Sequence, residues 1–74
     1  MTDAVRILGI DPGSRVTGFG IVDCDGPNAA YVASGAIRSV EGSFSDRLKQ
    51  IYRSVAEIVE EYRPHVVAVE SVFM

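Results

Sequence analysis

The chain has 74 residues, of which 47% are hydrophobic, and carries a net charge of −3 at pH 7. This length allows one small domain, and this composition excludes a disordered chain and argues against a non-specific nucleic-acid binder. The single cysteine, Cys24, permits neither an internal disulfide nor a cysteine-based zinc site, which suits a reducing compartment. Because no apolar run reaches the ~20 residues that span a bilayer, we expect a cytoplasmic protein without a membrane partner.

The first predicted element is a strand over residues 5–10, apolar or β-branched at nearly every position. A short run that is apolar on both faces is typical of a central strand. Asp11, Pro12 and Gly13 follow it and fit the first three positions of a tight turn. We therefore expect Asp11 where the strand leaves the core, with its carboxylate facing a cleft. The charge of Asp11 must then be compensated, either by backbone N–H groups of the turn or by a metal ion.

Two further strands are predicted over residues 17–23 and 30–38, the second of them weak and at a sheet edge. Residues 25–28 between them are dense in turn formers and predict a hairpin. Gly18 and Gly20 lie on the same face of their strand. They either make room for a side chain packed above them or let a substrate backbone pass close to the sheet.

A helix is predicted to begin after Ser43 and to end at Arg63 and Pro64, because the residue before proline disfavours helical geometry. Ser43, with Asp46 three residues on, resembles a capping box. Apolar residues recur at alternating spacings of four and three and form one stripe: Phe44, Leu48, Ile51, Val55, Ile58 and Tyr62. The opposite, charged face is predicted to be solvated.

A fourth strand over residues 66–69 is again apolar on both faces and is predicted to be central. A helix that joins two buried strands implies a crossover, so this strand is expected to lie parallel to an earlier one. Two central strands with a single helix leave one sheet face without a layer. We therefore expect the exposed face to favour oligomers or a partner layer. His65, directly before this strand, is predicted to be a surface residue.

Asp11 and Glu70 each end an apolar strand. If the two strands are parallel neighbours, about 4.8 Å apart, both carboxylates emerge at the same edge of the sheet, where open α/β sheets bind ligands. Two like charges at this place require a proton or a cation, and oxygen-only ligands suit Mg²⁺ or Mn²⁺. The alternative is that one carboxylate is simply exposed while the other caps a turn.

Residues 7–20, together with Ser34-Gly35, Arg47-Leu48 and residues 69–74, closely resemble the start of the RuvC family of Holliday-junction resolvases. The resemblance covers almost the whole chain and implies an α/β, RNase H-like fold. In that fold three antiparallel strands and a helix precede a fourth strand that is parallel to the first. The resemblance also implies a Mg²⁺-dependent endonuclease, with Mn²⁺ as a possible substitute. The family acts as a homodimer on four-way junction DNA in recombination and repair, with RuvA and RuvB as branch-migration partners.

On this resemblance, Asp11 and Glu70 match two of the family's four catalytic, metal-binding carboxylates. Phe73 matches an aromatic residue near the junction centre, where stacking on an unpaired base is worth about 1–3 kcal/mol. Arg15 lies beside the active-site turn, from which it can reach a DNA phosphate; the alternative is a solvated arginine. The family's two other carboxylates have no counterpart here. We therefore interpret residues 1–74 as the N-terminal part of a single RNase H-like nuclease domain and expect this chain to be inactive alone.

Two alternatives remain open at this point. One is a nucleotide-binding domain of the actin/sugar-kinase type, which also opens with a strand, an Asp-x-Gly turn and a hairpin. The acidic end of the fourth strand at Glu70 argues against it. The other is a non-enzymatic interaction fragment that docks on another chain through its exposed sheet.

Overall fold

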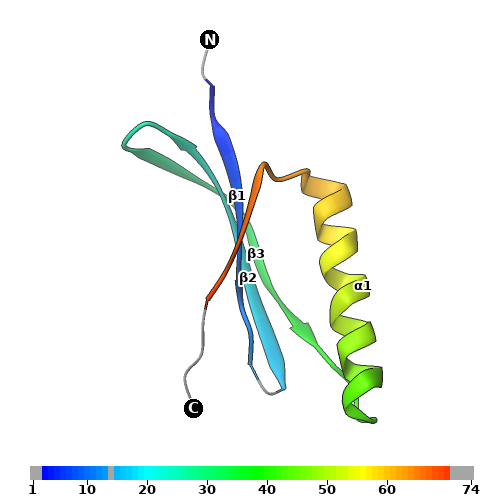
Figure 1. Cartoon of the computed structure of the whole chain (residues 1–74). Coiled ribbons are helices and arrows are strands. Elements are labelled where there is room, and N and C mark those ends of the chain that lie inside the picture. Colours follow the sequence, from blue (N-terminus) through cyan, green and yellow to red (C-terminus); the bar gives the residue numbers. More distant parts are fainter. Residues whose placement is uncertain (1–2, 14, 71–74) are drawn as a thin grey trace.

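The computed structural model describes residues 3–13 and 15–70, which form three strands, a helix and a fourth strand (Figure 1). These elements are β1 (Val5–Asp11), β2 (Val16–Asp25), β3 (Asn28–Arg38), α1 (Phe44–Tyr62) and β4 (Val66–Val69). The predicted order of elements is confirmed. β2 and β3 both run two residues further toward their hairpin than predicted, and Gly26 in the turn has a φ of 59°, a left-handed value that glycine adopts readily.

The four strands form one mixed sheet in the order β3-β2-β1-β4. β1 pairs with β2 and β2 with β3 in the antiparallel sense, whereas β1 and β4 are parallel. This is the arrangement predicted for an RNase H-like fold, and β3 lies at an edge as expected. β4 is parallel to β1 because α1 carries the chain from the end of β3 back to the opposite end of the sheet, where β4 begins (Figure 1).

Both ends of α1 follow the capping rules. The hydroxyl of Ser43 accepts a hydrogen bond from the backbone N–H of Asp46 at 3.2 Å, which satisfies one of the free donors of the first turn. At the other end Arg63 adopts a left-handed conformation with φ 49°, and its N–H donates to the carbonyl of Val59 at 2.9 Å. The predicted helix limits are therefore confirmed.

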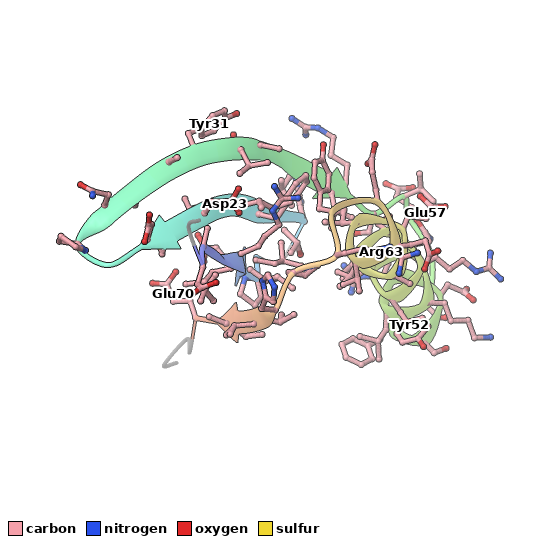
Figure 2. All side chains as sticks on the ribbon, turned by 90° about the horizontal axis from the view of Figure 1, so that it is seen from above. Asp23, Tyr31, Tyr52, Glu57, Arg63 and Glu70 are labelled. Carbon is pink, nitrogen blue, oxygen red and sulfur yellow. The ribbon has the colours of Figure 1, made fainter. Side chains whose placement is uncertain are left out.

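The core is small and consists of side chains at paired positions on neighbouring strands. Leu8 of β1 and its β2 partner Ile21 are fully buried, and the pair of Thr17 and Ile37 is nearly so. The helix is less buried than its apolar stripe predicts. Phe44, the first residue of the stripe, remains 73% exposed. α1 lies beside the β3 side of the sheet, and its Glu57 points away from the strands (Figures 1 and 2).

The prediction of a covered central strand over residues 66–69 was wrong for β4. This strand lies at the edge of the sheet, and all four of its residues are exposed, with Val69 at 61%. Its apolar residues stay exposed because, within residues 3–13 and 15–70, the only helix packs beside β3 instead. The expected unfinished layer is thus seen on β4.

The Arg6 side chain joins the start of β1 to two other segments, a connection that the sequence pattern did not predict. Its guanidinium donates two hydrogen bonds to the Asp23 carboxylate on β2, at 2.8 and 3.0 Å, and a third to the carbonyl of Tyr62 at the end of α1, at 2.9 Å. The hydrogen bonds between Arg6 and Asp23 lower the pKa of Asp23 and raise the pKa of Arg6. The contact fixes the end of α1 against the sheet.

His65 extends the β1–β4 pairing by one residue. Its backbone N–H donates to the carbonyl of Arg6 at 2.8 Å, and its ring Nδ1 accepts the backbone N–H of Arg6 at 2.9 Å. The exposed position predicted for His65 is confirmed. Its side chain nevertheless has a structural role, since it satisfies a main-chain donor that the strand ladder does not reach.

Candidate active site

Asp11 and Glu70 leave the sheet side by side. β1 and β4 are parallel neighbours in which Ile10 pairs with Val69, so Asp11 and Glu70 occupy the next positions on the two strands. The backbone N–H of Glu70 donates to the carbonyl of Ile10 at 2.9 Å and continues the ladder to this point. The predicted meeting of the two acidic residues at one edge of the sheet is confirmed. Figure 2 shows Glu70 on the sheet side of the molecule, away from α1.

The Asp11 side chain changes the protonation of Glu70. Hydrogen bonding with Asp11, which becomes possible when one of the two groups carries a proton, raises the pKa of Glu70, and the negative charge of Asp11 and partial desolvation raise it further. A hydrogen bond between two carboxyl groups requires that one of them is protonated. The pair therefore attracts positive charge, which a proton supplies in the absence of a cation. Asp11 and Glu70 are both exposed, so solvent reaches them directly.

The face that carries the two acids is open. Alternation along the strands places Gly9, Gly18 and Gly20 on the same face as Asp11, over a groove of about 570 Å³ that Glu70 also lines. A Cβ atom at Gly20 meets no other atom within 4 Å, and one at Gly18 meets only the Cβ of Asp11 at 3.9 Å. Among the described residues no side chain packs over these glycines, so the structure favours the close approach of another molecule over internal packing.

The turn after β1 requires a glycine. A Cβ atom at Gly13 would collide with the backbone carbonyl oxygen of Val16, which is part of β2 and cannot rotate away. The turn was one candidate for compensating the charge of Asp11. However, among the described residues no backbone N–H donates to this carboxylate, and its one polar partner is Glu70.

Another predicted site residue, Arg15, does not line the carboxylate groove. Arg15 is exposed and lines a separate groove with Arg38 and Arg47. Phe73 lies outside the described residues. Within residues 3–13 and 15–70, no group of three or more acidic, histidine or cysteine side chains is placed to hold a metal ion, so Asp11 and Glu70 stand as a pair.

Together, the mixed sheet and the acidic pair at its edge define a protein with an RNase H-like fold and a candidate nuclease site. The family model "Crossover junction endodeoxyribonuclease RuvC" matches residues 7–74. The chain belongs to the RuvC family, as its motifs predicted.

Curated relatives carry the same family name. The chain is 50% identical over 68 residues to the RuvC protein of Shewanella woodyi, which covers 92% of this chain and 39% of that protein. It is also 50% identical over all 74 residues to RuvC of Hydrogenovibrio crunogenus, covering 43% of that protein. The chain thus spans about two fifths of the length of these relatives.

Solved structures support the same fold. Thermus thermophilus RuvC superimposes with a TM-score of 0.80 at 28% identity, over 95% of this chain and 45% of that one. The same protein in complex with a Holliday junction substrate gives 0.78 at 27% identity, over 95% and 44%. An Aquifex aeolicus PPX-GPPA enzyme, with a TM-score of 0.68 at 16% identity over 89% and 26%, shares the fold alone. These matches do not favour the actin/sugar-kinase alternative. In the part of the chain that is described, no helix is long and apolar enough to cross a membrane.

Proposed function

We propose that this chain contributes the first half of the active site of an endonuclease that hydrolyses phosphodiester bonds at four-way DNA junctions. The observation that carries the proposal is the pairing of Asp11 and Glu70 at the open edge of β1 and β4. Membership of the RuvC family supports the reaction, and the Thermus thermophilus RuvC complex with a Holliday junction supports the substrate.

Asp11 and Glu70 suit a divalent cation. Both offer only oxygen donors, which hard cations such as Mg²⁺ and Mn²⁺ prefer. The raised pKa of Glu70 supports this assignment, because a site that holds an extra proton also favours a cation in its place. When bound, a divalent ion supplies an activated water and neutralises charge on the phosphate. We favour Mg²⁺, with Mn²⁺ as a possible substitute.

The roles of the protein groups follow from their positions. Asp11 and Glu70 orient the cation at the strand ends, and the glycine face beside them lets a DNA strand approach the sheet closely. We assign Phe73 to stacking on a base near the junction centre and Arg15 to a phosphate. We also propose, as part of this function, a homodimer in the cytoplasm that works with RuvA and RuvB.

A junction-nicking assay tests the proposal in the protein at its full natural length. With Mg²⁺ present we expect nicks in a four-way junction but not in a linear duplex of the same sequence, and no nicks in EDTA. Glu70→Gln keeps the size of the side chain but removes its charge, so the rate should fall on the order of a thousand-fold. Glu57→Gln on the outer face of α1 is the matched control and should leave the rate unchanged (Figure 2).

Junction nicking that survives Glu70→Gln at an unchanged rate would contradict the proposed site. Absence of nicking in the unaltered protein, combined with saturable binding of ATP, would favour the actin/sugar-kinase alternative. Absence of both, combined with a stable complex with another chain, would favour an interaction module.

A further inference from the structure

We propose that Arg15, Arg38 and Arg47 form a second DNA contact, which binds a backbone phosphate other than the one that is cleaved. This inference rests on the proposed function and adds a substrate-positioning site to it. The three side chains line a groove of about 580 Å³ that is separate from the carboxylate groove. Sequence reasoning linked only Arg15 to a phosphate, because it did not show that Arg38 and Arg47, which lie further along the chain, come close to Arg15 in the fold.

Three different segments bring these arginines together. Arg15 lies just before β2, Arg38 is the last residue of β3, and Arg47 lies in the first turns of α1. The pairing of Val16 with Arg38 places the first two beside each other at one end of the β2–β3 ladder. In Figure 1 the start of β2, the end of β3 and the start of α1 all lie in the lower part of the molecule.

The groove is positively charged although the chain as a whole carries −3. One acidic residue, Glu41, lines it together with the three arginines, which leaves two positive charges in excess. Within the described ranges, the ion pairs engage Arg6 and Arg63 and none of these three. Arginine presents several N–H donors in one plane, which matches the oxygens of a phosphate.

Arg47 supplies a second, independent observation. Its Nε atom is buried, yet it has no hydrogen-bond partner in the described part of the chain. A buried N–H group without an acceptor is costly, and native structures rarely leave one in that state. Rotation of the Arg47 side chain toward the groove would let a phosphate oxygen supply the missing acceptor.

The position of the groove relative to the acidic pair suits a DNA strand. Asp11 pairs with Gly18, and Arg38 lies two residues further along and two strands away. Strand geometry makes this a backbone separation of about 12 Å. A DNA strand that passes over Asp11 can therefore place another of its backbone phosphates, a small number of nucleotides away, at the arginines.

The test measures junction binding as a function of salt in the protein at its full natural length. A fluorescent four-way junction is titrated in EDTA, which prevents nicking, at several KCl concentrations. Each lost phosphate contact should reduce the slope of log K against log salt by about one. We expect this reduction for Arg38→Ala, at least as large a reduction for Arg38→Ala combined with Arg47→Ala, and recovery in Arg38→Lys. Because Arg38 is exposed, its replacement should not disturb folding.

Arg53→Ala is the matched control, since it removes an exposed arginine of α1 that does not line this groove. It should keep the slope of the unaltered protein. Slopes for Arg38→Ala and the double variant that equal that of Arg53→Ala would overturn the inference while the proposed function stands. If the unaltered protein neither binds nor nicks the junction, the proposed function fails first and this inference fails with it.

Discussion

The two ends of β1 carry charged pairs of opposite character. At its start, Arg6 faces Asp23 of β2 with two hydrogen bonds, and the pKa of Asp23 is lowered. At its end, Asp11 faces Glu70, which directly follows β4, and the pKa of Glu70 is raised. Both pairs join neighbouring strands of the same sheet. One pair is complete within the chain, whereas the other holds two like charges and needs a proton or a cation.

This difference separates a structural contact from a functional one. A pair of opposite charges stabilises the fold in which it forms, although an exposed pair does so only modestly. A pair of like charges disfavours the folded state, and its persistence indicates a group that is supplied from outside. β1 thus fixes the end of α1 at one end of the sheet and carries the proposed cation site at the other.

Replacing the aspartate of each pair, Asp11 or Asp23, by asparagine should give opposite results. Asp11→Asn should reduce Mg²⁺-dependent junction nicking on the order of a thousand-fold, because it removes one of the two carboxylates proposed to bind the cation. It should leave the melting temperature in the absence of Mg²⁺ unchanged or raised, since a like-charge contact disappears. Asp23→Asn should keep the nicking rate and lower the melting temperature by about 5 °C.

Nicking rates and thermal melting of the two variants, measured in the same buffer, check this pair of predictions. Loss of nicking in Asp23→Asn without loss of folded protein would contradict the separation of roles. So would a melting temperature in EDTA that drops for Asp11→Asn as far as it does for Asp23→Asn.

The acidic end should also depend on the turn that positions Asp11. Gly13→Ala places a Cβ against the carbonyl oxygen of Val16, so the turn must shift. We expect a loss of about 1–3 kcal/mol in the free energy of unfolding and a lower nicking rate, because Asp11 moves with the turn. Gly20→Ala meets no atom within 4 Å and should leave stability unchanged, which makes it the control. Denaturant unfolding of both variants measures the difference; equal stability would contradict it.

The sequence predicted the acidic end well because local rules control it. An apolar strand, a turn of Asp11, Pro12 and Gly13, and a crossover helix sufficed to place Glu70 beside Asp11. The cap at Ser43 and the stop at Arg63 were equally local. The contacts of Arg6 at the start of β1 were not predicted. The contact with Asp23 depends on the register of the antiparallel β1–β2 pair, and the contact with Tyr62 depends on how α1 packs against the sheet. The exposure of β4 was missed for a similar reason, since strand composition does not show which layer covers the strand.

The two pairs should also titrate in opposite ways. The pKa of Asp23 is lowered from its ordinary 3.8, so its contribution to stability is complete above that pH and is lost as the pH falls through the lowered value. The pKa of Glu70 is raised from 4.5, so the folded state gains from its proton below that pH and loses the gain as the pH rises through the raised value. Carboxyl ¹³C NMR titration should show the Glu70 value falling toward 4.5 in Asp11→Asn and when Mg²⁺ is added. A Glu70 titration that neither change moves would contradict the shared proton.

The smallest effect is expected at His65, whose side chain supports the start of β1 through one hydrogen bond. Its Nδ1 accepts the backbone N–H of Arg6, so His65→Ala leaves that donor to water and should cost about 0.5–1.5 kcal/mol of unfolding free energy. His65→Asn is the matched variant, because the side-chain oxygen of asparagine lies close to the position of Nδ1 and should retain most of the stability. Amide hydrogen exchange at Arg6 provides a local measure: it should speed up in His65→Ala and remain slow in His65→Asn. Equal exchange in both variants would mean that the imidazole is not what holds the start of β4 against β1.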